Sequence, residues 1–137
     1  MNVFLDENLN LRLCGILGDV APFHTFEHAN DLKLRNVEDT ALFSRVVEKG
    51  FDLMITDDRR QLKVDSEFQA LRDSGLHWAT IKKSNLAGLP GLSADAAALV
   101  SCLPHLEEIV MGSERPQLIR LYRGRREKTQ LLRHMDL

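Results

Sequence analysis

The chain has 137 residues, of which 44% are hydrophobic and 28% are charged, and its formal net charge is −2. This length suits one domain with its own hydrophobic core and is too short for two ordinary domains. No apolar run approaches the roughly 20 residues that a membrane helix needs, and the first residues lack the basic and apolar regions of a signal peptide. We therefore expect a globular, cytoplasmic protein with no membrane partner.

The hydrophobic pattern predicts strands that alternate with helices along the chain. In chain order, the predicted elements are a strand at 3–5, a helix at 9–18, a strand at 23–26, a helix at 37–49, a strand at 53–55, a helix at 65–72, a strand at 76–81, a helix at 93–110 and a strand at 116–123. Pro104 predicts a kink in the longest helix, and a basic tail follows from about residue 124. Because parallel strands need crossover connections, the alternation favours an α/β fold with a mainly parallel sheet between two helical layers.

The cysteines and histidines show no pattern typical of a metal site. Cys14 and Cys102 lie in apolar helical segments without a CxxC or Cys/His grouping, which indicates reduced core thiols. The histidines lack paired metal-ligand spacing, so each is interpreted as a structural or surface residue. They are His24, His28, His77, His105 and His134.

Acidic residues stand at the ends of two predicted strands and at the start of one predicted helix. Asp6 ends the first strand, Asp39 begins the second helix, and Asp57-Asp58 follows the central strand. In open α/β sheets ligands bind outside the carboxyl ends of the strands, and right-handed crossovers can bring these positions together. Clustered carboxylates repel one another unless a proton or a cation neutralises them. Carboxylate oxygens with open water positions suit Mg²⁺ or Mn²⁺, so this set is a candidate metal site.

Each of these residues also has a structural interpretation. Asp6 and Asn8 can cap a helix. Asp39 favours a helix N-terminus electrostatically, and Asp58 can form a turn. The arginines near the C-terminus either bind phosphates or are simply solvated. The shared position on one rim of the sheet favours a functional role for the acidic set, while both interpretations stay open for each member.

At these positions the sequence resembles the PIN-like domain family, in particular its VapC-type toxin-like branch. The first strand leads into the motif Asp6-Glu7-Asn8-Leu9, and a loop from His28 ends at the acidic helix start Asp39. The central strand continues into Thr56-Asp57-Asp58-Arg59, which is similar to the family's threonine, any residue, aspartate and basic residue. The resemblance covers roughly residues 2–123.

The resemblance implies a single PIN-like domain over residues 1–137, with a three-layer α/β/α fold. It implies a Mg²⁺- or Mn²⁺-dependent endoribonuclease that hydrolyses RNA phosphodiesters and is the toxin of a toxin–antitoxin pair. RNA and a cognate antitoxin protein are then its partners, and the question of a homodimer stays open.

Residue by residue, the resemblance implies that Asp6, Asp39 and Asp58 are catalytic and bind the metal, with Asp57 as a substitute ligand. Glu7, Asn8 and Thr56 then support the site. The candidates for contact with RNA phosphates are Arg59, Arg60, Arg123, Arg125 and Arg126.

Two other functions remain compatible with the sequence. No residue matches the fourth acidic position of classical PIN nucleases, although Asp65 and Asp73 lie in that region. This leaves room for a noncatalytic PIN-like module that binds RNA or a protein. The strand that ends at Asp57 also resembles the phosphoacceptor strand of a receiver domain. A receiver needs a lysine two strand–helix units later, and Lys82 and Lys83 come too early for that position.

Overall fold

The fold is a six-stranded sheet with helices on both faces. The computed structural model describes residues 1–58, 60, 62–122 and 132–137. Its sheet has the order β2-β1-β3-β4-β5-β6, in which β1 to β5 run parallel and β6 pairs antiparallel with β5. The elements are β1 (Asn2–Leu5), α1 (Leu13–Val20), β2 (Thr25–His28), α2 (Asp39–Glu48), β3 (Leu53–Thr56), α3 (Asp65–Ser74), β4 (His77–Ile81), α4 (Gly88–Gly112), β5 (Gln117–Leu121) and β6 (Leu132–Asp136).

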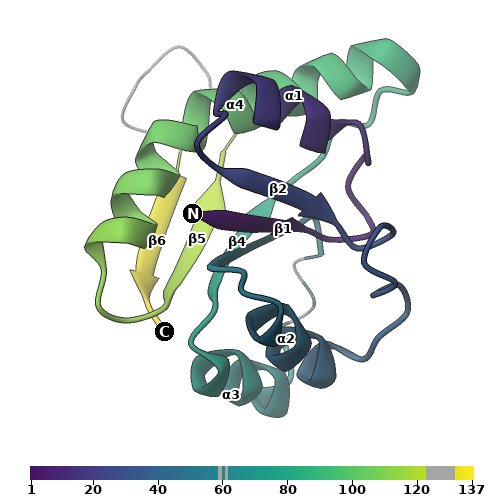
Figure 1. Ribbon diagram of the computed structural model, residues 1–137. Helices are drawn as coiled ribbons and strands as arrows, with labels where there is room; N and C mark the ends of the chain where they lie inside the picture. The colour runs from purple at the N-terminus through teal and green to yellow at the C-terminus, as the bar shows by residue number, and fades with distance from the viewer. Residues whose placement is uncertain (59, 61, 123–131) are drawn as a thin grey trace.

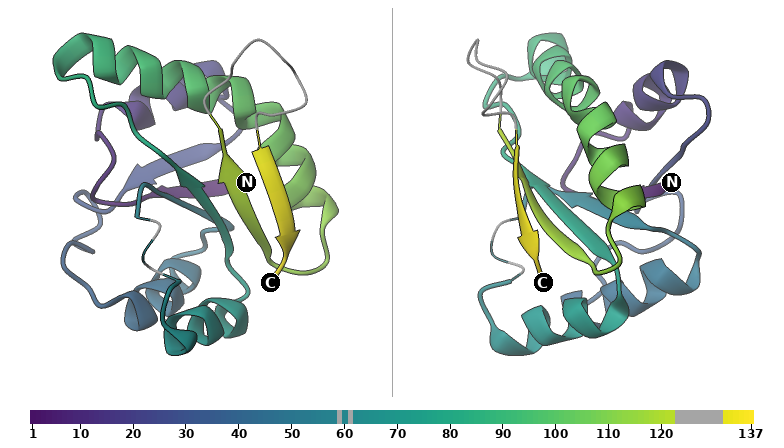
Figure 2. Two further views of the ribbon diagram at one scale, coloured as in Figure 1. Left: turned by 180° about the vertical axis from the view of Figure 1, so that it is seen from behind. Right: turned by 90° about the vertical axis from the view of Figure 1, so that its left-hand side faces the viewer.

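The helices divide into two layers, one on each side of the sheet. Helices α1 and α4 cover one face, and α2 and α3 cover the other (Figures 1 and 2). The predicted three-layer α/β/α arrangement with a mainly parallel sheet is therefore confirmed. Because both faces are covered, the parallel strands read as continuous apolar runs rather than as alternating sequences.

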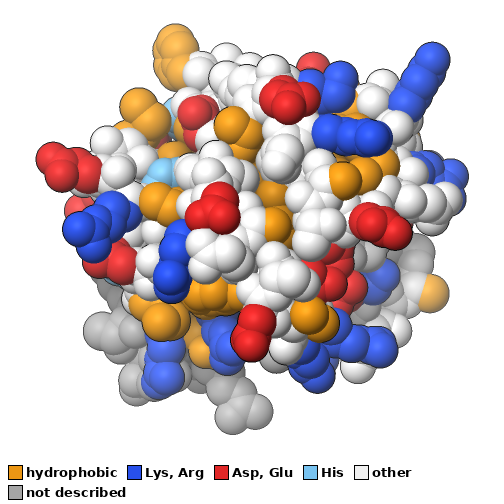
Figure 3. All heavy atoms as spheres, turned by 90° about the horizontal axis from the view of Figure 1, so that it is seen from below, with side chains coloured by type: hydrophobic (Ala, Val, Ile, Leu, Met, Phe, Trp, Pro, Cys, Tyr) orange, Lys and Arg blue, Asp and Glu red, His pale blue; other side chains and the backbone are white. Residues whose placement is uncertain are grey.

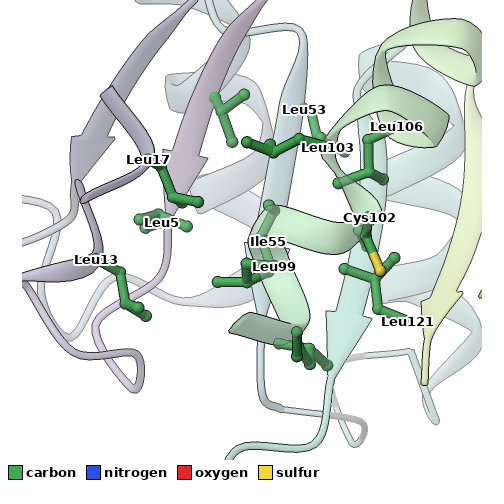
Figure 4. Close-up of a cluster of buried hydrophobic side chains, with 14 of the residues drawn as sticks. Leu5, Leu13, Leu17, Leu53, Ile55, Leu99, Cys102, Leu103, Leu106 and Leu121 are labelled. Carbon is green, nitrogen blue, oxygen red and sulfur yellow. The ribbon is translucent and has the colours of Figure 1, made fainter. Parts of the chain in front are cut away.

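The central strands contribute side chains to two hydrophobic cores, one on each face of the sheet. Successive side chains of a strand point to opposite faces, so Leu5 packs into the core under α1 and α4 while Phe4 packs into the core over α2 and α3. Figure 4 shows the first core, where Leu5 and Ile55 of the strands lie near Leu99 of α4. All of these side chains are fully buried, which fixes the strands whose ends form the candidate site.

The first helix starts later than the sequence pattern predicts. It begins at Leu13 rather than at residue 9, because turns closed by Leu9 N to Asp6 O and by Leu13 N to Asn10 O precede it. Leu9 is buried although it precedes the helix. Its spacing from Leu13 and Leu17 therefore reflects burial in one core rather than membership of one helix.

The longest helix starts earlier than predicted. It begins at Gly88 rather than at Ser93, and Pro90 is accommodated in the first turn, where the missing N–H needs no helical acceptor. Pro104 lies inside the helix, and α4 changes direction along its length in both views of Figure 2. The predicted kink is thus present, with loss of a backbone donor at proline as its cause.

The sixth strand was not predicted. Residues 132–136, which the sequence pattern assigned to a basic tail, form β6 at the edge of the sheet. Exposed residues 133–136 lack an apolar alternation, and backbone pairing with β5 holds the strand. The Gln117 amide adds a hydrogen bond from Nε2 to Asp136 Oδ1 at 2.6 Å. Charged side chains on such an edge discourage pairing with other chains.

None of the helices in the described ranges is long and apolar enough to cross a membrane. On the face formed by α2 and α3, acidic and basic side chains are interspersed (Figure 3). This face therefore offers no extended basic surface among its described residues.

Candidate active site

The candidate site lies at the carboxyl ends of β1, β3 and β4, which are neighbours in the sheet. Asp6 directly follows β1, Asp57 and Asp58 directly follow β3, and Lys82 directly follows β4. Parallel strands end at the same edge, so these segments meet although up to 76 positions separate them along the chain. The edge is where open α/β sheets bind their ligands.

Asp6 is held in a fixed orientation by its neighbours. Only 5% of the residue is exposed. Its Oδ1 accepts a hydrogen bond from the backbone N–H of Glu7 at 2.8 Å, and its Oδ2 accepts from Thr56 Oγ1 at 2.7 Å and Asn8 Nδ2 at 3.2 Å. Three donors therefore satisfy this buried carboxylate and hold it in one orientation at the end of β1.

Thr56 joins the two strand ends. Its hydroxyl donates to Asp6 and accepts hydrogen bonds from the backbone N–H of Asp58 at 3.0 Å and from Asn8 Nδ2 at 3.2 Å. The side chain is fully buried. The threonine of the predicted motif therefore sets the position of both candidate metal ligands, Asp6 and Asp58, relative to each other.

Asn8 connects the loop after β1 to the loop after β3. Besides its bonds to Asp6 and Thr56, its Oδ1 accepts the backbone N–H of Asp57 at 3.0 Å. The alternative that Asn8 caps the first helix is wrong, because the N-cap of α1 is Arg12 and the hydrogen bonds of the Asn8 side chain go to Asp6, Thr56 and Asp57. The same observation removes the helix-capping interpretation of Asp6.

A cleft of about 440 Å³ opens beside this network. Asp58 lines it, and its Oδ1 accepts the backbone N–H of Arg60 at 2.8 Å, which is the turn that the sequence allowed. Asp57 also lines it, with Oδ1 accepting the backbone N–H of Lys83 at 2.9 Å. The described residues that line the cleft are Asn8, Asp57, Asp58, Arg60, Lys82, Lys83 and Asn85.

Asp39 and Glu7 lie at the same edge of the sheet without lining this cleft in its described part. Asp39 is the half-buried first residue of α2. The loop before it reaches the site, because Asn36 N donates to Glu7 Oε2 at 3.3 Å and Arg35 Nε lies 3.7 Å from the same oxygen. Glu7 therefore pairs with a basic neighbour, Arg35, and connects the loop after β1 to the loop that precedes α2.

The sequence of this edge of the sheet falls within a match to a known protein family. The model of the PIN-like domain matches residues 1–83, which is more than half of the chain. The chain belongs to the PIN-like domain family. No curated protein and no solved structure matches the chain significantly. The matched segment of this PIN-like domain includes the acidic residues that follow β1 and β3 and the lysines that follow β4, so the family similarity and the site geometry concern the same residues.

Family membership places this chain among modules of the nuclease type, which are generally dependent on divalent metals. It gives no support to the receiver interpretation, whose lysine would stand two strand–helix units after Asp57. Only α3 and β4 separate Asp57 from Lys82 and Lys83.

The donor set of the PIN-like domain fits a magnesium-type ion in its chemistry. Among the residues that the structure describes, no group of three or more His, Cys, Asp or Glu side chains is arranged to hold a metal. Mg²⁺ usually binds through one or two carboxylates and keeps several waters, so the linked pair Asp6 and Asp58 supplies the kind of oxygens that it requires. The assignment of Asp39 and Asp57 as further ligands stays a prediction.

Sequence reasoning missed the basic side of the cleft. Lys82, Lys83 and Asn85 line it together with the acidic residues, and Arg60 is the predicted phosphate contact that the structure places there. The position of the lysines directly after β4 was the available signal, since the rule that located Asp6 and Asp58 applies to every parallel strand. The other predicted phosphate contacts lie outside the described residues: Arg59, Arg123, Arg125 and Arg126.

The histidines with described bonds have structural partners. His28 is buried, with Nε2 2.8 Å from Leu9 O, and Nδ1 of His77 accepts the backbone N–H of Gln117. Burial lowers the pKa of His77 although the Asp52 carboxylate acts to raise it. Cys14 and Cys102 are not joined in a disulfide; Cys14 is half-buried and Cys102 is buried.

Proposed function

We propose that this PIN-like domain is a metal-dependent ribonuclease that hydrolyses RNA phosphodiesters. The observation that supports the proposal is the Thr56 hydroxyl, which bonds both the Asp6 carboxylate and the backbone N–H of Asp58, the residue that lines an open cleft beside it. The pair falls within the segment that matches the family. The resemblance of the motifs to VapC-type toxins supports the finer proposal of a toxin paired with an antitoxin.

In this mechanism Asp6 and Asp58 would hold the ion, with Asp39 binding directly or through a water. The bound Mg²⁺ or Mn²⁺ would supply Lewis-acid polarisation of a phosphoryl oxygen and of a water. Thr56 and Asn8 keep the Asp6 carboxylate in one orientation through their hydrogen bonds to Oδ2. Preorganised oxygens of this kind need little rearrangement when the substrate arrives.

A noncatalytic PIN-like binding module is the second candidate. It is favoured by the lack, among the described residues, of a group of three or more metal-binding side chains. The Asp57 carboxylate also accepts a hydrogen bond from the backbone N–H of Lys83, so Asp57 has a structural role in holding the loop after β4. Such a module would retain the cleft and bind RNA without cleaving it.

Cleavage of RNA by purified variants tests the proposal. The wild type, Asp6→Asn/Asp58→Asn and Asp19→Asn are incubated with single-stranded and structured RNAs in Mg²⁺, Mn²⁺ or EDTA. Asp19 is an exposed aspartate of α1, so its variant controls for the loss of one negative charge away from the rim. Circular dichroism confirms that each variant folds.

The proposal predicts cleavage that requires metal, survives in Asp19→Asn and is lost in the double variant. Loss of one interaction that acts only in the transition state commonly costs about 100-fold in rate. Equal cleavage by the wild type and the double variant would contradict the assignment of the site. RNA binding without cleavage in either metal would favour the binding module.

The toxin assignment has its own test. Induced expression of the wild type should arrest bacterial growth, and co-expression of the protein encoded next to it should relieve the arrest. The Asp6→Asn/Asp58→Asn variant should leave growth unaffected. Growth arrest by both forms would separate toxicity from the acidic pair.

A further inference from the structure

Lys82 and Lys83, in the loop after β4, form a basic wall of the cleft that Asp57 and Asp58 also line. Lys82 and Lys83 line the cleft together with Arg60, against the two carboxylates of Asp57 and Asp58. The described lining therefore has one more cationic than anionic side chain, although the whole chain is net negative. A concentration of cations in a cleft raises the local concentration of anionic ligands.

This wall is fixed to the sheet by its backbone. The N–H of Lys83 donates to Asp57 Oδ1 at 2.9 Å, and the N–H of Ser84 donates to Oδ1 of the buried Asp95 at 2.8 Å. Ser84 Oγ in turn accepts the N–H of Leu86 at 3.1 Å. Asp57 and Asp95 hold successive residues of the loop from two different elements, so the lysine backbone has a set position relative to β3 and α4.

The Lys83 ammonium reaches the loop after β1. Its Nζ donates to the backbone oxygen of Asn8 at 3.1 Å, and the Asn8 side chain donates to Asp6. An ammonium has three N–H donors, so a lysine bonded to one carbonyl can also bind a phosphate oxygen. A phosphate on Lys83 would lie at the edge of the sheet where the linked carboxylates end.

From these contacts we infer that Lys82 and Lys83 form the phosphate-binding wall of the cleft and position an RNA strand against Asp6 and Asp58. The inference rests on the proposed function for its substrate and deepens it, since it names the residues that bind the backbone. Asp57 is then a positioning residue that holds the loop through Lys83 N. Contacts with the RNA phosphates are independent of base identity, so they position the RNA strand without selecting a base sequence.

Binding measured without catalysis tests this inference separately from the nuclease activity. The affinity for a fluorescent single-stranded 2′-O-methyl RNA is measured in EDTA over a series of salt concentrations. The proteins are the wild type, Lys82→Gln/Lys83→Gln, Lys82→Arg/Lys83→Arg and Lys49→Gln/Arg115→Gln. Lys49 and Arg115 are exposed at the opposite end of the sheet, so the last variant removes the same charge away from the cleft.

Each phosphate contact contributes about −0.7 to the slope of log K against log salt for single strands, which corresponds to about eight-fold in affinity near 50 mM salt. The glutamine pair should therefore bind about 60-fold more weakly and show a slope smaller by about 1.4. The arginine pair should bind like the wild type, and so should the control pair.

Three results would overturn the inference: no measurable binding by the wild type at low salt, equal affinity and slope in the glutamine pair, or an equal loss in the control pair. Absence of metal-dependent cleavage with the predicted binding pattern intact would contradict the nuclease proposal and leave the phosphate-binding wall in place. Cleavage that persists unchanged in the glutamine pair, with unchanged binding, would retain the nuclease and remove the lysines from its site.

Discussion

Replacing Thr56 with valine should lower the stability of the fold, because its one hydroxyl holds the two segments that carry the candidate metal ligands Asp6 and Asp58. Thr56 is fully buried, and its Oγ1 donates to Asp6 and accepts from Asn8 and from the backbone of Asp58. Thr56→Val keeps the branched shape and removes these bonds. Only 5% of Asp6 is exposed, so water has little access to replace the lost donor.

The expected loss follows from the types of bond removed. A hydrogen bond to a charged group contributes about 1.5–3 kcal/mol, and a neutral one contributes about 0.5–1.5 kcal/mol. The methyl group of valine returns part of this through burial of apolar surface. We therefore expect Thr56→Val to lower the free energy of unfolding by about 2–4 kcal/mol.

Thr80 provides a matched control on the neighbouring strand. It pairs with Thr56 in the register of β3 and β4 and is 2% exposed. Its buried Oγ1 has no hydrogen-bond partner in the described part of the chain. Since an unsatisfied buried hydroxyl costs free energy, Thr80→Val should be neutral or stabilising by up to about 2 kcal/mol.

Urea unfolding followed by the fluorescence of Trp78 measures both effects. Trp78 is the single tryptophan and lies in the core on β4. An unchanged dependence on urea would show that the denatured state is comparable in all proteins. If Thr56→Val loses no more stability than Thr80→Val, the hydroxyl network does not hold the rim and the reasoning is refuted.

Two further predictions concern burial elsewhere in the fold. Because burial lowers the pKa of His77 below 6.5, the unfolded chain binds more protons just below that pH and stability should fall on acidification from neutral pH. The free energy of unfolding should fall more steeply with decreasing pH in the wild type than in His77→Asn, by at most about 1.4 kcal/mol per pH unit. If the free energies of unfolding of the two proteins change with pH in parallel, the prediction is wrong. A Cβ at Gly91 would clash with the carbonyl oxygen of Leu86, so Gly91→Ala should cost about 1–3 kcal/mol in thermal unfolding. At Gly112 of the same helix a Cβ meets no atom within 4 Å, and an equal loss in Gly112→Ala would argue against the clash.

The alternation of strands and helices was predictable because each buried element has an apolar pattern of its own. The edge strand β6 was not, since its exposed residues have no such pattern and its stability depends on pairing with β5. The start of α1 was also missed, because Leu9 is buried for the same reason as Leu13 but belongs to a turn. Hydrophobic spacing reports burial, and it reports secondary structure only where the two coincide.

Part of the candidate site was predictable from the parallel sheet alone. Asp6 and Asp58 follow strands that the pattern identified, and parallel strands end at one edge. The position of Lys83 after β4 was visible in the same way, but its contact with Asn8 was not, because that contact depends on the order of β1, β3 and β4 in the sheet. The order of strands in a sheet results from tertiary packing, which no local pattern contains.

Asn8 shows why the motif after β1 requires an amide at this position. Its Nδ2 donates to the carboxylate of Asp6, its Oδ1 accepts the backbone N–H of Asp57, and its backbone oxygen accepts Lys83 Nζ. An ionised aspartate could accept from Asp57 but could not donate to Asp6, and it would place a second negative charge beside a buried one. An alanine would remove one of the hydrogen bonds to the Asp6 carboxylate and the acceptor of the Asp57 backbone N–H. A side chain with one donor and one acceptor end therefore joins the two acidic strand ends, and the backbone oxygen of the same residue holds the basic loop after β4.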